Sequence, residues 1–107
     1  MRFEIILAPQ TIAQQRSLPA HVRSQVRDAL EMHLRHEPTR VSRSRIKRLR
    51  GLARPQYRLR VDEMRVFYDV AEDRVEILAI VSKAEAQAWL DDEGTPSSSS
   101  STGRGEG

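Results

Sequence analysis

Residues 57 to 82, YRLRVDEMRVFYDVAEDRVEILAIVS, alternate apolar and polar side chains over three short runs. Successive side chains of a β-strand point to opposite faces, so this alternation predicts strands with one apolar and one polar face. Two segments between the runs, Asp62-Glu63 and Ala71-Glu72-Asp73, suit tight turns. The stretch therefore predicts a three-stranded antiparallel meander whose polar face holds three guanidinium groups, those of Arg58, Arg60 and Arg65.

The apolar positions of the meander predict the core. The first two runs place these residues on the core face: Tyr57, Leu59, Val61, Met64, Val66, Tyr68 and Val70. The third run is apolar at nearly every position, which is typical of a central strand covered on both faces. There we expect Val75, Ile77, Ala79 and Val81 on the core face, and Glu76, Leu78 and Ile80 on the other.

The remaining elements follow from periodicity and from helix-breaking residues. Ser17-Leu18-Pro19 is a good helix start, with a capping hydroxyl and a proline in the first turn, and Pro38 ends that helix. The expected elements are a strand over residues 2 to 8, a short helix over 10 to 16, a long helix over 19 to 36, a short strand near 46 to 49 within a loop, and a short helix over 83 to 89.

These elements predict a small α+β domain. Helices would pack on one face of an antiparallel sheet of three or four strands, with a strand before the helices and a short helix after the sheet. We expect the folded domain to cover residues 1 to 92. Residues 93 to 107 contain no large apolar side chain, and we expect a disordered low-complexity tail there.

The charge of the chain is concentrated in its folded part. Residues 1 to 90 hold 17 basic and 11 acidic side chains, a net charge of +6. Nine bases and no acid lie between Arg40 and Arg60. This density suits a phosphate-rich partner or an acidic protein segment, and a solvated basic face is an equal alternative.

Several function classes lack the residues that they need. The chain has no cysteine, which excludes disulfides, thiolate metal sites and thiol catalysis. His33 and His36 have helical spacing but no evident third ligand, so we expect no metal. No P-loop, GxGxxG motif or Ser-His-Asp arrangement is present, and no cofactor is implied. No apolar run reaches the roughly 20 residues of a membrane span, so we expect a cytoplasmic protein without membrane contact.

Four segments together resemble a known protein family: LPAHVRSQVRDALEMHLRHEP, IKRLRGL, YRLRVDEMRVFYDV and RVEILAIVSKAEAQAW. Over about residues 1 to 90 the chain is similar to the RelE/ParE superfamily of toxins from bacterial type II toxin–antitoxin systems. The resemblance implies a RelE-like endoribonuclease, or mRNA interferase, that cleaves messenger RNA on the ribosome and so inhibits translation. It also implies a cognate antitoxin that covers the basic surface and binds operator DNA.

Two alternatives within the resemblance stay open. A ParE-like toxin would inhibit DNA gyrase without cleaving RNA. A degenerate relative would only bind its antitoxin, through an apolar groove and the basic face.

The resemblance assigns catalytic positions to Arg58, Arg60, Arg65 and Lys83. Trp89, in the final helix, stands where many RelE-like nucleases have a tyrosine, and Lys83 stands where they have an arginine. Trp89 can stack on a base but has no ionisable hydroxyl, and packing in the core is an alternative role for it. The arginines could instead be edge charges that deter sheet aggregation.

Metal-independent RNA cleavage through the 2′-OH needs a base, charge stabilisation at phosphorus and an acid. Arginine suits charge stabilisation, because its planar fork binds phosphate at two points and stays charged. Lys83 or Lys47 could act as the base, and Glu85 is the carboxylate alternative. We expect further RNA contacts from Arg45, Lys47, Arg48, Arg50 and Trp89.

Overall fold

The computed structural model describes residues 1 to 97. Its elements, in chain order, are β1 (Glu4–Leu7), α1 (Pro9–Ser17), α2 (Ala20–Ala29), a π-helical turn η1 (Leu30–Leu34), β2 (Ile46–Arg48), β3 (Leu52–Arg54), β4 (Tyr57–Val61), β5 (Met64–Ala71), β6 (Arg74–Ser82), a 3-10 turn η2 (Lys83–Glu85), α3 (Ala86–Glu93) and β7 (Thr95–Pro96). The predicted α+β class is confirmed. Among the described residues, no helix is long and apolar enough to cross a membrane.

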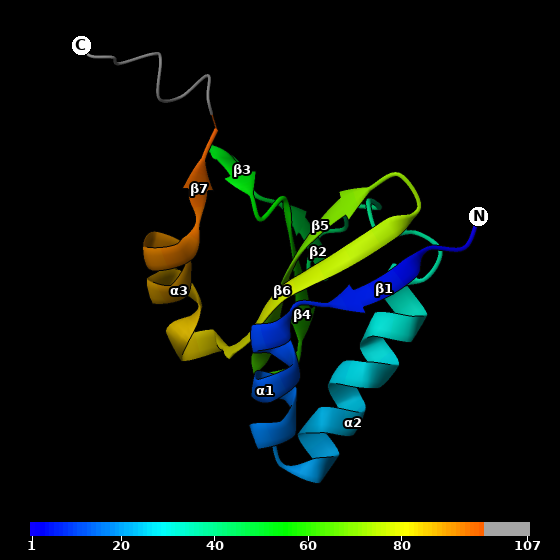
Figure 1. The fold of residues 1–107 in the computed structure, drawn as a ribbon, viewed down its shortest axis with the longest axis vertical. Coiled ribbons are helices and arrows are strands. Elements are labelled where there is room, and N and C mark those ends of the chain that lie inside the picture. Colours follow the sequence, from blue (N-terminus) through cyan, green and yellow to red (C-terminus); the bar gives the residue numbers. More distant parts are fainter. Residues whose placement is uncertain (98–107) are drawn as a thin grey trace.

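The main sheet has five strands in the order β1-β6-β5-β4-β2 (Figure 1). The predicted meander is β4, β5 and β6, paired antiparallel. The sheet is larger than predicted because β6 accepts a strand on its other edge: β1 pairs with it in parallel, with Ile5 opposite Val75. The connection between these two parallel strands contains the helical hairpin formed by α1 and α2, followed by strands β2 to β5.

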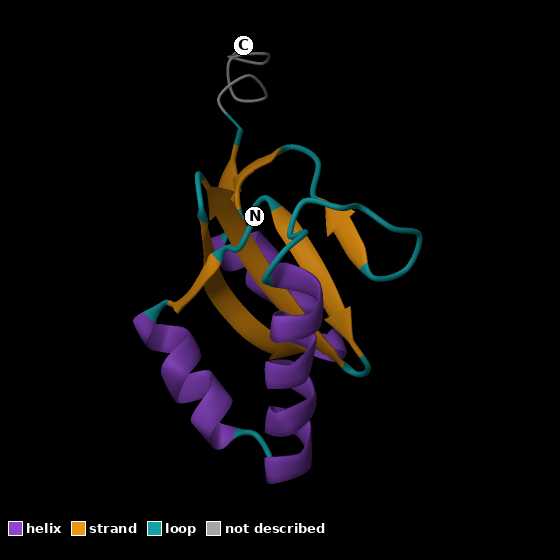
Figure 2. Ribbon diagram, turned by 90° about the vertical axis from the view of Figure 1, so that its right-hand side faces the viewer, coloured by secondary structure: helices purple, strands orange, loops and turns teal. Residues whose placement is uncertain are grey.

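The core lies between one face of this sheet and the helix α2 with its continuation η1. Val26, Leu30 and Leu34 are buried against a group of sheet residues that includes Leu59, Val66, Tyr68 and Ile77. Figure 2 shows this helix lying across the sheet. The fully buried Tyr68 donates its hydroxyl hydrogen to the carbonyl oxygen of Pro38 at 2.7 Å. This bond ties the loop after the helix to the centre of the sheet.

A β-bulge between β5 and β6 changes which residues face the core. Phe67 pairs with Ala79 but Tyr68 pairs with Ile77, so Leu78 is an extra residue on β6. Because one inserted residue reverses the faces beyond it, Ile80 lies opposite Val66 on the core side. The prediction that Ala79 and Val81 face the core and Ile80 faces away is therefore wrong.

Helix α1 covers the edge of β6 beyond the end of β1. The amide of Gln10 donates to the Leu78 carbonyl at 3.1 Å, and the Gln14 side-chain oxygen accepts from the Ile80 backbone N–H at 2.8 Å. The buried Thr11 hydroxyl donates to the Ala8 carbonyl at 2.7 Å. The two glutamine side chains therefore satisfy backbone groups of β6 that a longer β1 would otherwise pair.

The start of α2 differs from the prediction. Ser17 is the last residue of α1, and its hydroxyl donates to the Gln14 carbonyl at 2.8 Å instead of capping α2. Pro19 is the N-cap of α2 and offers no side-chain cap. Arg23 joins the two helices, because its guanidinium donates to the Leu18 carbonyl at 3.0 Å and the Gln15 carbonyl at 3.3 Å.

The expected domain boundary after residue 92 falls inside α3. Beyond this helix, β7 pairs with β3 in a separate two-stranded sheet. Pairing of this kind depends on a partner about forty residues earlier, which the local composition of the tail does not reveal. Residues 98 to 107 of the expected tail lie outside the described residues.

Candidate functional site

Strand register gathers basic side chains on the face of the sheet opposite α2. Cross-strand partners share a face, and Lys47 lies opposite Arg58 while Arg60 lies opposite Arg65. The backbone N–H of Arg60 donates to the Arg45 carbonyl at 2.9 Å, which extends the pairing of β2 with β4 by one residue. We call this surface the basic face: Arg45, Lys47, Arg58, Arg60 and Arg65.

Arg58 and Arg65 are half-buried, and Arg58 is the member of the basic face whose environment is most unusual. Its Nε atom is buried and has no hydrogen-bond partner among the described residues. Burial lowers the pKa of the Arg58 guanidinium, and the positive charges of Arg65 and Arg60 lower it further. The charges of Arg65 and Arg60 therefore disfavour the positive charge of Arg58, and no ion pair joins Arg58 to another residue that the structure describes.

Arg65 and Lys83 frame the turn at the end of this face. The Nη1 atom of Arg65 donates to the backbone carbonyls of Asp62 at 2.8 Å and Met64 at 2.9 Å. The backbone N–H of Lys83 donates to the Glu63 carbonyl at 2.7 Å. The turn between β4 and β5 is thus held on both sides, and the exposed Lys83 follows directly after β6 beside it.

Trp89 of α3 lies over the same side of the sheet. Its ring stacks on that of Phe67, with centroids 5.0 Å apart and an interplanar angle of 6°. Phe67 is opposite Arg58 in the register and is fully buried, whereas Trp89 is only half-buried. The aromatic pair forms an apolar wall next to the Arg58 side chain.

Two residues expected to contact RNA do not join the basic face. Arg48 is opposite Tyr57, on the core side of the sheet, with its guanidinium carbon 5.2 Å from the centroid of that ring. Its Nη1 atom donates to the Gln56 carbonyl at 2.9 Å. Arg50 is exposed in the turn between β2 and β3. Strand alternation separates Arg48 from Lys47, although the two are adjacent in sequence.

An acidic cluster that the sequence did not reveal borders the basic face. Asp69 and Glu76 are partners in the register, and Arg54 reaches both, at 3.7 Å and 3.4 Å. Burial raises the pKa of Asp69, although its carboxylate accepts a hydrogen bond from the Gln56 backbone N–H at 2.7 Å. Arg54 is therefore held in ion pairs, unlike Arg58.

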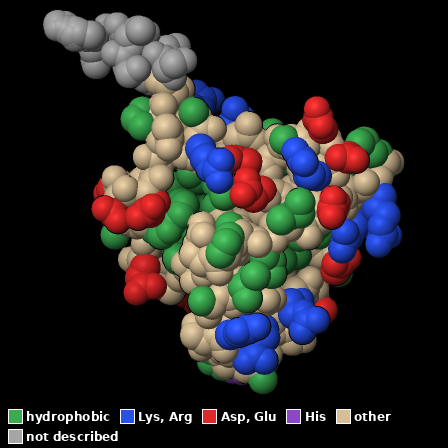
Figure 3. Space-filling model, viewed as in Figure 1, with side chains coloured by type: hydrophobic (Ala, Val, Ile, Leu, Met, Phe, Trp, Pro, Cys, Tyr) green, Lys and Arg blue, Asp and Glu red, His purple; other side chains and the backbone are tan. Residues whose placement is uncertain are grey.

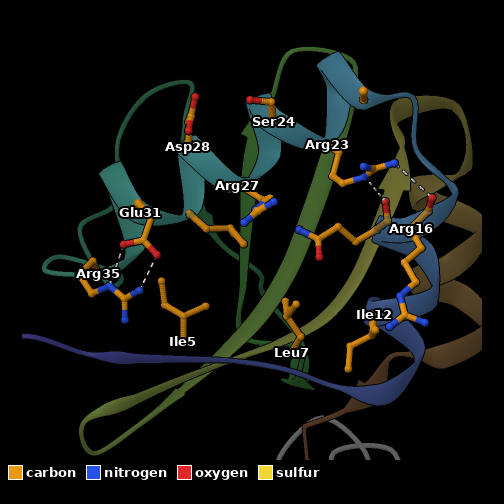
Figure 4. Close-up of a pocket in the computed structure, with 13 residues that line it drawn as sticks. Ile5, Leu7, Ile12, Arg16, Arg23, Ser24, Arg27, Asp28, Glu31 and Arg35 are labelled. Carbon is orange, nitrogen blue, oxygen red and sulfur yellow. Dashed lines mark hydrogen bonds and ion pairs between the residues drawn. The ribbon is translucent and has the colours of Figure 1, made fainter.

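A concave surface lies on another side of the molecule from the basic face. It is a groove of about 710 Å³ between β1, α1 and α2, with Ile5, Leu7 and Ile12 among its apolar residues (Figure 4). Arg35 pairs with Glu31 at its rim. Figure 3 shows side chains of both charges around exposed apolar groups on the side from which β1 is seen, and acidic groups over α3. This side is not uniformly basic.

No family model matches the sequence, and no curated protein does. Solved structures do match the fold. A chain of the archaeal RelE–RelB complex from Pyrococcus horikoshii OT3 superposes with a TM-score of 0.59 and 25% identity, over 78% of this chain and 97% of that one. A mutant of the Escherichia coli toxin RelE in the free state superposes with a TM-score of 0.63 and 20% identity, over 83% of this chain and 92% of that one. The chain has the RelE-like toxin fold.

The likeness extends to a second group of RelE-like structures. The YoeB dimer from Staphylococcus aureus superposes with a TM-score of 0.58 and 16% identity, over 76% of this chain and 97% of that one. These matches cover nearly the whole length of the solved chains. Within the RelE-like fold, the basic face of this chain occupies strands β2, β4 and β5, and Trp89 reaches it from α3.

Proposed function

We propose that this protein is the toxin of a type II toxin–antitoxin pair and that it cleaves messenger RNA on the ribosome. The observation that carries the proposal is the environment of Arg58. The buried Nε–H of this half-buried arginine has no hydrogen-bond partner among the described residues, which costs free energy in the free protein, and an anion that accepts a hydrogen bond from it would remove that cost. Arg60 and Arg65 lie beside it and would bind the same polyanion.

The chemistry of the basic face suits single-stranded RNA. Guanidinium groups bind phosphate oxygens at two points, and an aromatic ring such as that of Trp89 can stack on an exposed base. The spacing of the cations also fits the phosphates of an extended RNA chain, because residues two apart along β4 are separated by about 6.6 Å. Arg58 and Arg60 would therefore bind neighbouring parts of one RNA backbone.

The proposed reaction is an attack of the ribose 2′-oxygen on the adjacent phosphorus. A base removes the 2′-OH proton, the new P–O bond forms, and the bond to the 5′-oxygen of the next nucleotide breaks as that oxygen receives a proton. The products are a 2′,3′-cyclic phosphate and a 5′-hydroxyl end. Arg58, Arg60 and Arg65 would stabilise the extra charge at phosphorus, and Lys83 would transfer a proton. Lys47, opposite Arg58, is the second amine on this face.

We also propose a cytoplasmic antitoxin partner whose acidic segment covers the basic face and which binds operator DNA. The P. horikoshii complex contains RelB with RelE, and a complex from S. aureus contains YefM with YoeB. A negatively charged segment complements the five cations of the basic face.

The test is controlled expression in a bacterial host, followed by mapping of RNA ends. The wild-type protein should arrest growth and produce 5′-hydroxyl ends within translated transcripts, and purified protein should cut mRNA only when ribosomes are present. Arg65→Ala should lose both effects, whereas Arg74→Ala, an exposed arginine at the start of β6, should retain them. If transcripts stay intact during growth arrest, or if Arg65→Ala cleaves as well as the wild type, the nuclease assignment is wrong.

A ParE-like inhibitor of DNA gyrase is the second candidate. It is favoured by Trp89, which supplies no ionisable hydroxyl and is stacked on Phe67. Growth arrest with DNA damage and intact transcripts would identify this activity. An absence of any growth effect would indicate a protein that only binds its antitoxin.

A further inference from the structure

Helix α3 carries Trp89 to the basic face although the helix itself has little contact with the core. None of its eight residues is buried, and Ala86, Trp89 and Leu90 are half-buried. Its ring contact with the sheet is the stack of Trp89 on Phe67. Short helices owe most of their stability to tertiary packing, so the position of α3 depends strongly on what holds its two ends.

The first end of α3 is held by residues close to it in the chain. The Ser82 hydroxyl accepts a hydrogen bond from the Glu85 backbone N–H at 3.3 Å. The backbone N–H of Lys83 donates to the Glu63 carbonyl at 2.7 Å. These contacts fix the turn that leads from β6 into the helix, but they leave its far end to be held by something else.

The far end of α3 is joined to β3. One residue, Gly94, separates the helix from β7, and its backbone N–H donates to the Leu90 carbonyl at 2.8 Å. The junction is tight, because a Cβ atom on Gly94 would lie 2.6 Å from that carbonyl oxygen. In β7, Thr95 lies opposite Arg54 of β3. The end of the helix is therefore placed by the position of β3.

Arg54 links β3 to the main sheet. β3 belongs to a two-stranded sheet with β7 that is separate from the main one. From there the Nε atom of Arg54 lies 3.7 Å from the Asp69 carboxylate, and its Nη2 atom lies 3.4 Å from that of Glu76. We call these two ion pairs the Arg54 bridge. Asp69 is two residues along β5 from Phe67, so the two lie on the same face.

These contacts form a closed path over one face of the sheet. It runs from Phe67 through Trp89, along α3 to β7 and β3, and through the Arg54 bridge back to Asp69. A closed path restricts the position of each member more than a single contact does. Trp89 is therefore held from two directions, by its stack on Phe67 and by the far end of its helix.

We propose that Arg54 is a positioning residue for Trp89, which it holds through β3, β7 and α3 in the place where an RNA base stacks on the indole ring. This inference rests on the proposed function, because it takes single-stranded RNA as the ligand. A guanidinium suits the task, since its planar fork can bind two carboxylates in a fixed orientation.

A direct contact of Arg54 with phosphate is the competing role, and charge separates the two. Arg54→Gln removes a positive charge, whereas Glu76→Ala removes a negative one, yet both break the Arg54 bridge. A phosphate-binding role predicts opposite effects of the two substitutions on RNA affinity. A positioning role predicts the same effect of both on base stacking.

Arg74→Gln is the matched control. Arg74 lines a hollow that Asp69 and Glu76 also line, but no ion pair joins it to another residue within the described part of the chain. Its loss changes the charge of the same region without breaking the bridge. The side chain of Arg54 is 53% exposed, and exposed ion pairs add little to global stability, so all three variants should melt close to the wild type.

Two measurements follow Trp89. It is the only tryptophan, so its emission reports the surroundings of this one ring. In Arg54→Gln and Glu76→Ala the emission should move to longer wavelength and acrylamide should quench it more strongly, while Arg74→Gln should match the wild type. The second measurement is the affinity for oligouridine RNAs in which each base in turn is replaced by an abasic site.

Removal of the stacked base should weaken binding to the wild type by about 5- to 150-fold. Both bridge variants should lose most of this ratio, and Arg74→Gln should keep it. Trp89→Leu should lose the ratio as well, and adding Arg54→Gln to Trp89→Leu should lower it no further, because a positioning residue acts through the group that it positions. If Arg54→Gln fails to fold, Glu76→Ala carries the same test.

The outcomes separate this inference from the proposed function. Unchanged emission and an unchanged ratio in both bridge variants, or a further loss when Arg54→Gln is added to Trp89→Leu, overturns the positioning role but leaves the basic face as an RNA site. A wild-type protein that binds RNA without any dependence on a base overturns it too. Failure of the wild type to bind RNA overturns both proposals. A ratio that depends on the Arg54 bridge, without cleavage on ribosomes, supports the positioning role and refutes the nuclease.

Discussion

Arg58→Met should make the fold more stable while it weakens RNA binding. The substitution keeps a long unbranched side chain beside Phe67 but removes the buried Nε atom and the charge that Arg60 and Arg65 repel. An unsatisfied buried polar group costs about 1–3 kcal/mol. Because the rest of this guanidinium is partly hydrated, we take the lower part of that range, a gain of about 1–2 kcal/mol in the free energy of unfolding.

Two assays measure the two effects. Thermal denaturation should show a higher midpoint, by about 4–8 °C for each kcal/mol in a domain of this size. Affinity for single-stranded RNA should fall about 10- to 150-fold, the equivalent of one charge-assisted hydrogen bond of about 1.5–3 kcal/mol. The slope of log affinity against log salt concentration should fall by about 0.7 for the phosphate contact that is lost.

Arg27→Met is the matched control. Arg27 is exposed on α2, on the side of the sheet away from the basic face, so the same loss of charge should change stability by less than about 0.5 kcal/mol. Its effect on RNA binding should be much smaller than that of Arg58→Met. A lower melting temperature for Arg58→Met would refute the claim that the Arg58 guanidinium destabilises the free protein. An RNA affinity equal to that of Arg27→Met would refute the claim that Arg58 binds a phosphate of the RNA.

Three further predictions follow from individual contacts. Tyr68→Phe should cost about 1–3 kcal/mol in urea denaturation because the buried Pro38 carbonyl loses its donor, whereas Tyr57→Phe should be near neutral. Fluorescence of Trp89, the only tryptophan, should change when RNA stacks on it. Trp89→Leu should lower the free energy of unfolding by at least the contribution of its stacking on Phe67, about 0.5–1.5 kcal/mol. An unchanged melting midpoint would contradict that stacking contribution. Burial and the charge of Arg45 lower the pKa of His33, so the folded state binds its proton less readily than the unfolded state, and stability should fall as pH drops below about 6.5. His33→Gln should flatten that part of the pH profile, and an identical profile would exclude His33 as its source.

The groove between β1, α1 and α2 shows where prediction from sequence stops. The periodicity of Val22, Val26, Leu30 and Leu34 predicts the helix and its buried face, and the structure confirms both. The groove itself depends on β1 pairing in parallel with a strand about seventy residues later. Nothing within either segment specifies that partner.

The sequence by itself determined the meander and the shared face of its three arginines. Alternation is a local property: each strand turns every second side chain to the same side, so Arg58, Arg60 and Arg65 had to share a face once the turns formed. The same rule separates Lys47 from Arg48. Candidate cations could therefore be sorted as soon as the strand of each was known.

Only the tertiary structure decided how those cations differ. Arg54 lies in ion pairs with Asp69 and Glu76, whereas the buried Nε atom of Arg58 has no hydrogen-bond partner in the part of the chain that the structure describes. This difference arises because cross-strand register and burial depend on residues distant in sequence. The bulge at Leu78 and the pairing of β7 with β3 arise in the same way, from strand pairings that no single segment encodes. Local alternation selects the face of a side chain, but its charge environment is set by which other strands fold against it.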